Sequence, residues 1–375
     1  MKNLVHKLIK PVATAFVLAM VLIACETNPD IEPQADILPT QFGVDIPNSL
    51  SNNGAISGRI TGGRVTEDFL QGNDIYQHME TFILVGESAA EIVEDIIGSI
   101  RKHNISRAQI LSFKSDDDDR VKNLVVVELP EYEGVIYEYG LTITDAESEG
   151  NQDGGYGLQI FWNRNPIKGV ALIKPRNLDL VHDADAGEAI YKIEYNSESD
   201  LGYDAHMIVS IANLTLEEPN IDQYSMRTLK MFVGQKGDIV DVFGNSNHPN
   251  ATFFTNEIGF NWAFVASASA TDDLAVAEVG LPPSRLDETS RAVLLGTYAI
   301  KNVFANQIAQ AFPNLSQDLI DLYLMNTAGP GYFTNEGFVA GGTPPSGLWN
   351  TLELRIIDLV PYNPKDITNL QINFQ

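Results

Sequence analysis

Four acidic side chains within residues 145–156, DAESEGNQDGGY, have the spacing of ligands in a calcium-binding loop. They occupy positions 1, 3, 5 and 9 of a twelve-residue loop, and they are Asp145, Glu147, Glu149 and Asp153. Gly150 stands at position 6, where such a loop turns sharply. Position 12 is Tyr156 instead of a bidentate glutamate. The spacing indicates a weak calcium site as one candidate, and a solvated hairpin turn is the interpretation we favour.

A second group of side chains suited to a metal lies in HDADAGE, residues 182–188. An imidazole together with carboxylates is a donor set that transition metals accept, and here it would come from His182, Asp183, Asp185 and Glu188. A single histidine in a loop is more often a surface residue, so we regard this as the weaker metal candidate.

Motifs of known catalytic chemistry are missing from the sequence. It contains no GxSxG, HExxH, GxGxxG or Walker-loop pattern. We therefore name no catalytic residue and no cofactor-binding residue, and we expect no cofactor, with weak calcium binding kept as the less favoured alternative.

The single cysteine, Cys25, follows an apolar run from Val12 to Ala24. One thiol excludes an intrachain disulfide framework and zinc sites built on paired cysteines. Residues 1–10 carry three lysines and no acid, and a basic start before a short apolar core is the pattern of a secretory signal. A helix over this run would span only about 20 Å at ~1.5 Å per residue, which is short of the ~30 Å hydrocarbon core of a bilayer.

The sequence Leu22-Ile23-Ala24-Cys25 resembles the lipobox of bacterial lipoproteins, in which a branched apolar residue precedes two small or apolar residues and a cysteine. The resemblance implies a diacylglycerol group on the sulfur of Cys25 and cleavage after Ala24, so that residues 1–24 are a signal peptide. The phrases VDIPNSLS and FGNSNHPN are similar to uncharacterised envelope lipoproteins of Bacteroidota-type bacteria. Together these resemblances imply export and lipid anchoring to the bacterial cell envelope, at the outer membrane, and they imply no activity.

Residues 25–54 are expected to form a lipidated tether. Residues 26–54 contain four prolines, five acidic residues and no basic residue, and this composition keeps a chain extended. The whole chain has 24 Lys and Arg against 50 Asp and Glu, for a net charge of −26. Such a charge repels phosphate backbones, so we do not expect nucleic acid as a partner. The expected partners are the membrane, through lipid on Cys25, and an envelope or extracellular ligand.

Residues 55–375 are expected to form one α+β globular domain, with a possible subdivision near 282–288. Apolar spacing predicts two helices before residue 104, the second starting at a capping box at Ser88. From there to residue 281 the period changes to two, which predicts successive antiparallel hairpins in a large, curved sheet with flanking helices.

Three further expectations concern single elements. Trp162 and Trp262 fit the buried phase of their strands and should belong to the core. Helical patterns return at 300–312 and 316–324, and the second helix should have Leu319, Ile320, Tyr323 and Leu324 on its inner side. Residues 352–360, LELRIIDLV, are expected to form a closing strand.

Two functions of different classes fit these observations. The first is a non-catalytic, lipid-anchored envelope lipoprotein that binds a protein, glycan or lipid. The second is a tethered envelope hydrolase with an acid- or metal-based site that folding assembles. The missing nucleophile and metal motifs favour a binding protein over an enzyme.

Overall fold

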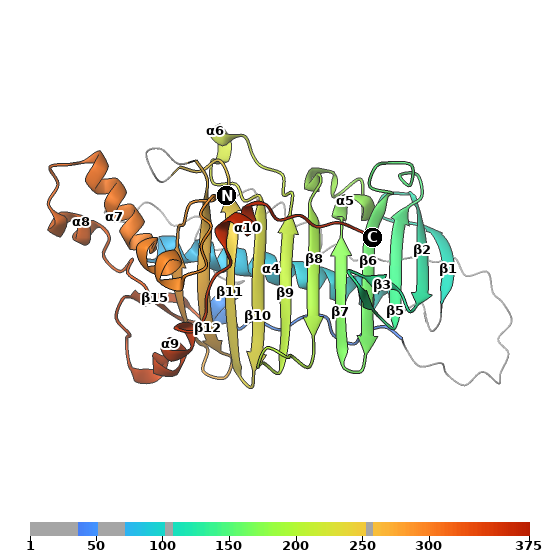
Figure 1. The fold of residues 1–375 in the computed structure, drawn as a ribbon, viewed down its shortest axis with the longest axis horizontal. Coiled ribbons are helices and arrows are strands. Elements are labelled where there is room, and N and C mark those ends of the chain that lie inside the picture. Colours follow the sequence, from blue (N-terminus) through green and yellow to red (C-terminus); the bar gives the residue numbers. More distant parts are fainter. Residues whose placement is uncertain (1–36, 52–71, 102–107, 253–257) are drawn as a thin grey trace.

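Thirteen strands form one open antiparallel sheet in which neighbouring strands follow one another along the chain (Figure 1). The computed structural model describes residues 37–51, 72–101, 108–252 and 258–375. In sheet order, the strands are β1 (Gln109–Lys114), β2 (Val121–Glu128), β5 (Tyr139–Asp145), β6 (Tyr156–Arg164), β7 (Ile167–Ile173), β8 (Ile190–Asn196), β9 (Ala205–Ala212), β10 (Thr228–Lys236), β11 (Ile239–His248), β12 (Phe260–Ser269), β13 (Leu274–Gly280), β14 (Gly331–Thr334) and β15 (Gly337–Gly341). A small hairpin of β3 (Glu131–Tyr132) and β4 (Val135–Ile136) stands apart. The predicted succession of antiparallel hairpins is confirmed.

Helices contribute a smaller part of the fold. They are α2 (Asn48–Ser51), α4 (Gly72–Arg101), α5 (Pro175–Leu178), α6 (Pro219–Asp222), α7 (Ile300–Ala311), α8 (Gln317–Tyr323), α9 (Asn350–Ile356) and α10 (Pro364–Thr368). The helices predicted at 300–312 and 316–324 are confirmed as α7 and α8.

Two predicted elements are wrong. We expected two helices before residue 104, but α4 is continuous and Ser88 lies in its interior. Gly86 interrupts the apolar pattern there, and one glycine weakens a helix by about 1 kcal/mol without ending it. We expected a strand at 352–360, but α9 occupies most of it, because Leu352 and Ile356 lie one helical turn apart and are both buried.

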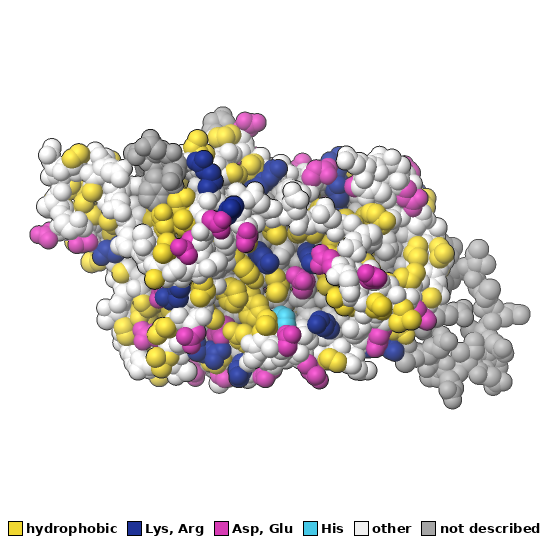
Figure 2. Space-filling model, viewed as in Figure 1, with side chains coloured by type: hydrophobic (Ala, Val, Ile, Leu, Met, Phe, Trp, Pro, Cys, Tyr) yellow, Lys and Arg dark blue, Asp and Glu magenta, His cyan; other side chains and the backbone are white. Residues whose placement is uncertain are grey.

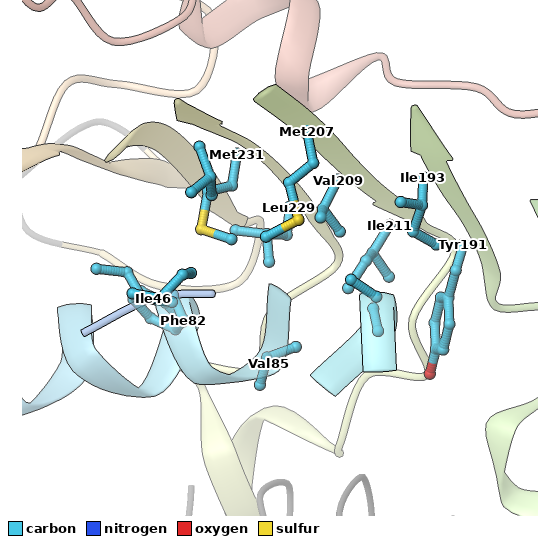
Figure 3. Close-up of a cluster of buried hydrophobic side chains, with 14 of the residues drawn as sticks. Ile46, Phe82, Val85, Tyr191, Ile193, Met207, Val209, Ile211, Leu229 and Met231 are labelled. Atoms are coloured by element: carbon cyan, nitrogen blue, oxygen red, sulfur yellow. The ribbon is translucent and has the colours of Figure 1, made fainter. Parts of the chain in front are cut away.

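The main core lies between α4 and one face of the sheet. Figure 1 shows α4 crossing the strands on the far side of the sheet. In Figure 3, Phe82 and Val85 of α4 point at side chains of β9 and β10, among them Met207 and Met231. The helix approaches β10 closely at Gly86, where an added Cβ would lie 2.3 Å from the Met231 Cε atom. Trp162 and Trp262 are buried in this core, as predicted.

Residues 37–51 also belong to this core, which differs from the extended tether expected over 25–54. Their apolar side chains are buried, namely Ile37, Leu38, Phe42, Val44, Ile46 and Leu50. The backbone is held as well, since the Trp162 Nε1 group donates a hydrogen bond of 2.7 Å to the Ile37 carbonyl. Burying each large apolar side chain stabilises the fold by about 1.5–3 kcal/mol, which outweighs the tendency of proline and acidic residues to keep this segment extended. The rest of the expected tether lies outside the described residues.

The opposite face of the sheet is covered at both ends and, across β10–β12, by α10. Near β12 and β13, α9 and the turn before it place Trp349, Leu352 and Ile356 on the sheet. Near β6 and β7, the β3–β4 hairpin and the last residues of the chain place Tyr132, Tyr137 and Ile372 there. In Figure 1 the chain after α10 crosses the near side of the sheet as far as β6. The part of β8–β11 that these covers and α10 leave open faces outward and forms the candidate site.

Candidate functional site

Aromatic side chains gather on the outward face of β9, β10 and β11. Met231 and Val233 of β10 point into the main core, so the alternating residues Lys230, Phe232 and Gly234 point the other way. Sheet pairing places Ile208, Phe232 and Phe243 side by side on three strands. Figure 2 shows hydrophobic side chains gathered over β10 and β11 on this face.

Five rings form what we call the aromatic patch, namely Tyr203, His206, Phe232, Phe243 and Tyr362. Phe232 and Phe243 stack with ring centroids 4.7 Å apart and 17° between their planes. His206 stacks on the other side of Phe232 at 5.6 Å, and Tyr362 contacts Phe243 at 5.4 Å. Phe232 is buried beneath its neighbours, whereas Phe243 and Tyr362 are half-buried.

Tyr203 reaches the patch because β10 has a glycine where its ring lies. An added Cβ on Gly234 would lie 2.6 Å from a carbon of the Tyr203 ring and 2.8 Å from a carbon of Phe232. Only a residue without a side chain leaves room for this contact. The tyrosine hydroxyl then donates a hydrogen bond of 3.0 Å to Asp241 on β11.

Asp241 is a buried carboxylate at the lower edge of the patch, and protein donors surround it. Ser267 donates to one oxygen at 2.7 Å, and Arg355 of α9 donates to both oxygens, through Nε at 3.0 Å and through Nη2. The carboxylate in turn raises the pKa of Arg355, mainly through the hydrogen bond. Burial, followed by the charge of Asp241, raises the pKa of Tyr203, so the hydroxyl remains a donor at neutral pH. With these four bonds Asp241 is suited to fixing its neighbours rather than to acid–base catalysis.

Lys230 borders the patch although the chain is strongly acidic. Lys192, Ser210 and Lys230 lie in one row across β8, β9 and β10. The Lys230 Nζ atom lies 4.8 Å from the centre of the Tyr362 ring, within the range of a cation–π interaction. Burial lowers the pKa of His206, whose Nδ1 atom is 2.7 Å from the Ser199 hydroxyl, so this imidazole is neutral at pH 7. The surface thus offers apolar ring faces with a cation at one side, which is a chemistry of binding.

The acidic loop at 145–156 engages its carboxylates with the protein's own donors. Asp145 accepts from Arg120 Nε at 2.6 Å and from Lys122 Nζ at 3.5 Å. Asp153 accepts from Lys174 Nζ at 2.7 Å, and its hydrogen bonds lower its pKa to about 2 against the opposing effect of burial. The other two are also bonded: Glu147 to Arg120, and Glu149 to Asn123 and Thr144.

These contacts leave the tentative calcium site as a prediction. In the part of the chain that the structure describes, no group of three or more His, Cys, Asp or Glu side chains is arranged to hold a metal ion. Each carboxylate of the loop would have to exchange a protein donor for the ion, which makes a strong site unfavourable.

The second metal candidate, residues 182–188, separates into two parts. The His182 Nδ1 atom lies 2.7 Å from Asp179, and this carboxylate raises the pKa of the imidazole. Burial, and next to it the charge of Asp179, raises the pKa of Asp183 to about 6. Glu188 points away and accepts from Lys174 at 2.6 Å.

The lipobox and Cys25 lie outside the described residues. The lipidation of Cys25 therefore stays a prediction. Within the described ranges, no helix combines the length and the apolar character needed to cross a bilayer.

Comparison of the chain with family models, with curated proteins and with solved structures gave no match in any of the three.

Sequence reasoning missed the aromatic patch. One signal was present: a two-residue turn at Gly237 and Asp238 fixes the hairpin register and places Phe232 opposite Phe243. Tyr362 is more than a hundred residues from these two, and only the folded chain brings it beside them.

Proposed function

We propose that this protein is a non-catalytic lipoprotein, exported and anchored to the cell envelope at the outer membrane by acyl chains on Cys25, which binds a glycan on its aromatic patch. The α+β class with a curved sheet is part of this proposal. The lipobox supports the anchor, and two acyl chains suffice for stable attachment without a basic patch.

The observation that supports glycan binding is the pair of half-buried rings, Phe243 and Tyr362, beside Lys230. Flat aromatic faces stack on the C–H face of a sugar ring, and a nearby ammonium donates to hydroxyl or carboxylate oxygens. An acyl chain would instead need a deep apolar cavity, and the charged border of this surface disfavours that ligand.

The anchor is tested with Cys25→Ala. Metabolic labelling with an acyl precursor should mark the wild type and leave the variant unlabelled, with the variant unprocessed or released from membranes. Equal labelling of the two would show that Cys25 is not the attachment point.

Glycan binding is tested by calorimetry on the mature chain, residues 25–375 with Cys25→Ala, against a set of neutral and acidic polysaccharides. Phe243→Ala/Tyr362→Ala should weaken binding at least tenfold, which corresponds to about 1.4 kcal/mol. Phe312→Ala is the matched control, because that ring is exposed far from the patch. The proposal fails if no polysaccharide binds, or if both variants bind like the wild type.

A tethered hydrolase is the second candidate, and Asp183 is the observation that favours it. A carboxylic acid with a pKa of about 6, beside His182 and Asp179, is poised to give or take a proton near neutral pH. Assays with chromogenic glycosides and esters at pH 5–7 test for hydrolase activity. Only turnover that Asp183→Asn abolishes would support the hydrolase.

A further inference from the structure

Helices α7 and α8 form a projection at the β13 end of the sheet, which we call the helical hairpin (Figure 1). The first turns of α7 are packed, with Ile300 and Val303 buried. The apolar pattern of the helix continues past this packed part to Phe312, whose side chain is 63% exposed. The apolar face of α7 therefore extends beyond the part of the helix that is packed against the rest of the protein.

Helix α8 is apolar on two sides. Ile320 and Leu324 are buried, as the sequence predicted. The other two residues expected on the inner side, Leu319 and Tyr323, are 51% and 37% exposed, so that part of the expectation is wrong. At about 100° per residue, Leu319, Leu322 and Tyr323 form a stripe roughly 100° wide, to which Leu315 of the preceding loop adds. Spacing of this kind is how a helix presents anchors to a hydrophobic groove.

The exposed stripe has an acidic residue, Asp318, at one border. Residues 302–354 contain no Lys, Arg or His, while Asp318 and Asp321 lie on α8 itself. Asp321 lies on the other side of α8, where its Oδ1 atom is 3.5 Å from the Lys301 Nζ atom of α7, whereas Asp318 is exposed beside the stripe. A complementary surface would therefore be apolar at its centre and basic at its rim.

We propose that the helical hairpin docks α8 into an apolar groove of a partner protein, and that Lys or Arg side chains edge this groove. Two other occupants fit less well. A second copy of this chain would bring the same aspartates together and would carry the same net charge of −26. A lipid surface would have to accept Asp318 beside the inserted leucines, and burying an aspartate in hydrocarbon costs about 2.5–3.5 kcal/mol.

The position of the hairpin agrees with a protein partner. The described chain begins at Ile37 against β6, whereas α7 starts beside β13, seven strands along the sheet. At ~4.8 Å per strand these points are about 34 Å apart. If the lipidated tether meets the folded body beside β6, the helical hairpin lies at the other end of the molecule, far from the membrane attachment.

The test starts with a photo-crosslinking amino acid at Leu319 of the full chain in its native cells, with Leu354 of α9 as a matched exposed position. The protein that is crosslinked at Leu319 and not at Leu354 is identified by mass spectrometry and purified. Its affinity for the mature chain, residues 25–375 with Cys25→Ala, is then measured by calorimetry. Leu319→Ser/Leu322→Ser should weaken this binding at least 100-fold, and Leu354→Ser/Ile357→Ser should change it less than threefold. Asp318→Asn should weaken it several-fold and reduce its salt dependence.

Several results would overturn the proposal. A crosslink to a second copy of this chain, or to lipid, would assign the hairpin to those occupants, and flotation with phosphatidylcholine vesicles that requires Leu319 would confirm the latter. The proposal of a protein partner would also be contradicted if no crosslinked product formed at Leu319, or if the two double variants bound the partner with equal affinity. Thermal melts exclude misfolding as a cause, since all four substituted leucine and isoleucine side chains are exposed.

Discussion

Arg355 of α9 donates two hydrogen bonds to the carboxylate of Asp241 on β11, and so ties the end of the chain to the centre of the sheet. Asp241 is almost completely buried, while Arg355 keeps 30% of its side chain exposed. Arg355→Ala would leave a buried carboxylate with only two hydroxyl donors. We expect it to lower the free energy of unfolding by about 2–3 kcal/mol, somewhat below the cost of breaking a fully buried pair. Urea denaturation measures this directly.

Arg164→Ala is the matched control for that prediction. Arg164 pairs with Glu138 at 3.0 Å, and both side chains are more than one-third exposed. Removing an exposed pair should cost less than about 1 kcal/mol. Similar losses in the two variants would mean that Asp241 tolerates burial without its arginine.

Calcium should leave the stability of the protein unchanged. The Arg120, Lys122 and Lys174 side chains already occupy the carboxylates of the 145–156 loop. Thermal melts with millimolar calcium and with chelator should therefore coincide. A site filled at ten times its dissociation constant would instead stabilise the fold by about 1.4 kcal/mol. If such a gain occurs and Glu147→Gln/Glu149→Gln abolishes it, the loop is a calcium site after all.

The buried imidazole of His248 should make the protein less stable below pH 6.5. Its Nδ1 atom donates to the Tyr224 carbonyl at 2.6 Å and its Nε2 atom accepts from the Ser246 hydroxyl at 2.8 Å. Burial lowers its pKa from 6.5 to about 4. Between these values the unfolded chain takes up a proton that the folded chain does not. Stability from this group is therefore complete above pH 6.5 and falls by about 3 kcal/mol as the pH drops to 4.

A variant separates this effect from the titration of the many carboxylates. His248→Gln cannot gain the proton, so the difference in unfolding free energy between wild type and variant should shrink as the pH falls from 7 to 4. His182→Gln should behave in the opposite way, because the hydrogen bond to Asp179 raises the pKa of His182, so its difference from the wild type should grow as the pH falls. A difference that stays constant with pH for His248→Gln would show that this imidazole is not held neutral.

The sheet was largely predictable because its signal is local. Alternation in segments such as 156–162 and 260–266 predicted strands, although both faces of β6 and β12 are buried, and short turns join strands such as β10 and β11. The failures occurred where distant contacts decide. Residues 37–51 read as a tether from their prolines and acids, yet Phe42 and Leu50 find a surface on a sheet formed later in the chain. In the same way, α9 is a helix because β12 and β13 receive Leu352 and Ile356.

The candidate site was less predictable than the fold. Phe232 and Phe243 could be paired from the hairpin register, but both also read as ordinary strand residues. Their role depends on Tyr362 and Arg355, which arrive from the last thirty residues of the chain. Spacing along the sequence contains no signal for contacts of that range. The carboxylates of the 145–156 loop were visible as spacing, and they are bonded to protein donors.

Two glycines of α4 should respond to substitution in opposite directions. Gly98 has nothing within 4 Å of the position its Cβ would take, so Gly98→Ala replaces a poor helix former without a clash. It should raise the free energy of unfolding by about 0.5–1 kcal/mol. Gly86 touches the flexible end of Met231, and the branched side chain of Gly86→Val should force α4 away from β10 at a cost of about 1–3 kcal/mol. Urea denaturation of both variants measures these changes. Destabilisation by Gly98→Ala would indicate that a further part of the chain covers that side of the helix, and a neutral Gly86→Val would show that α4 does not approach β10 as closely as the contact with Met231 requires.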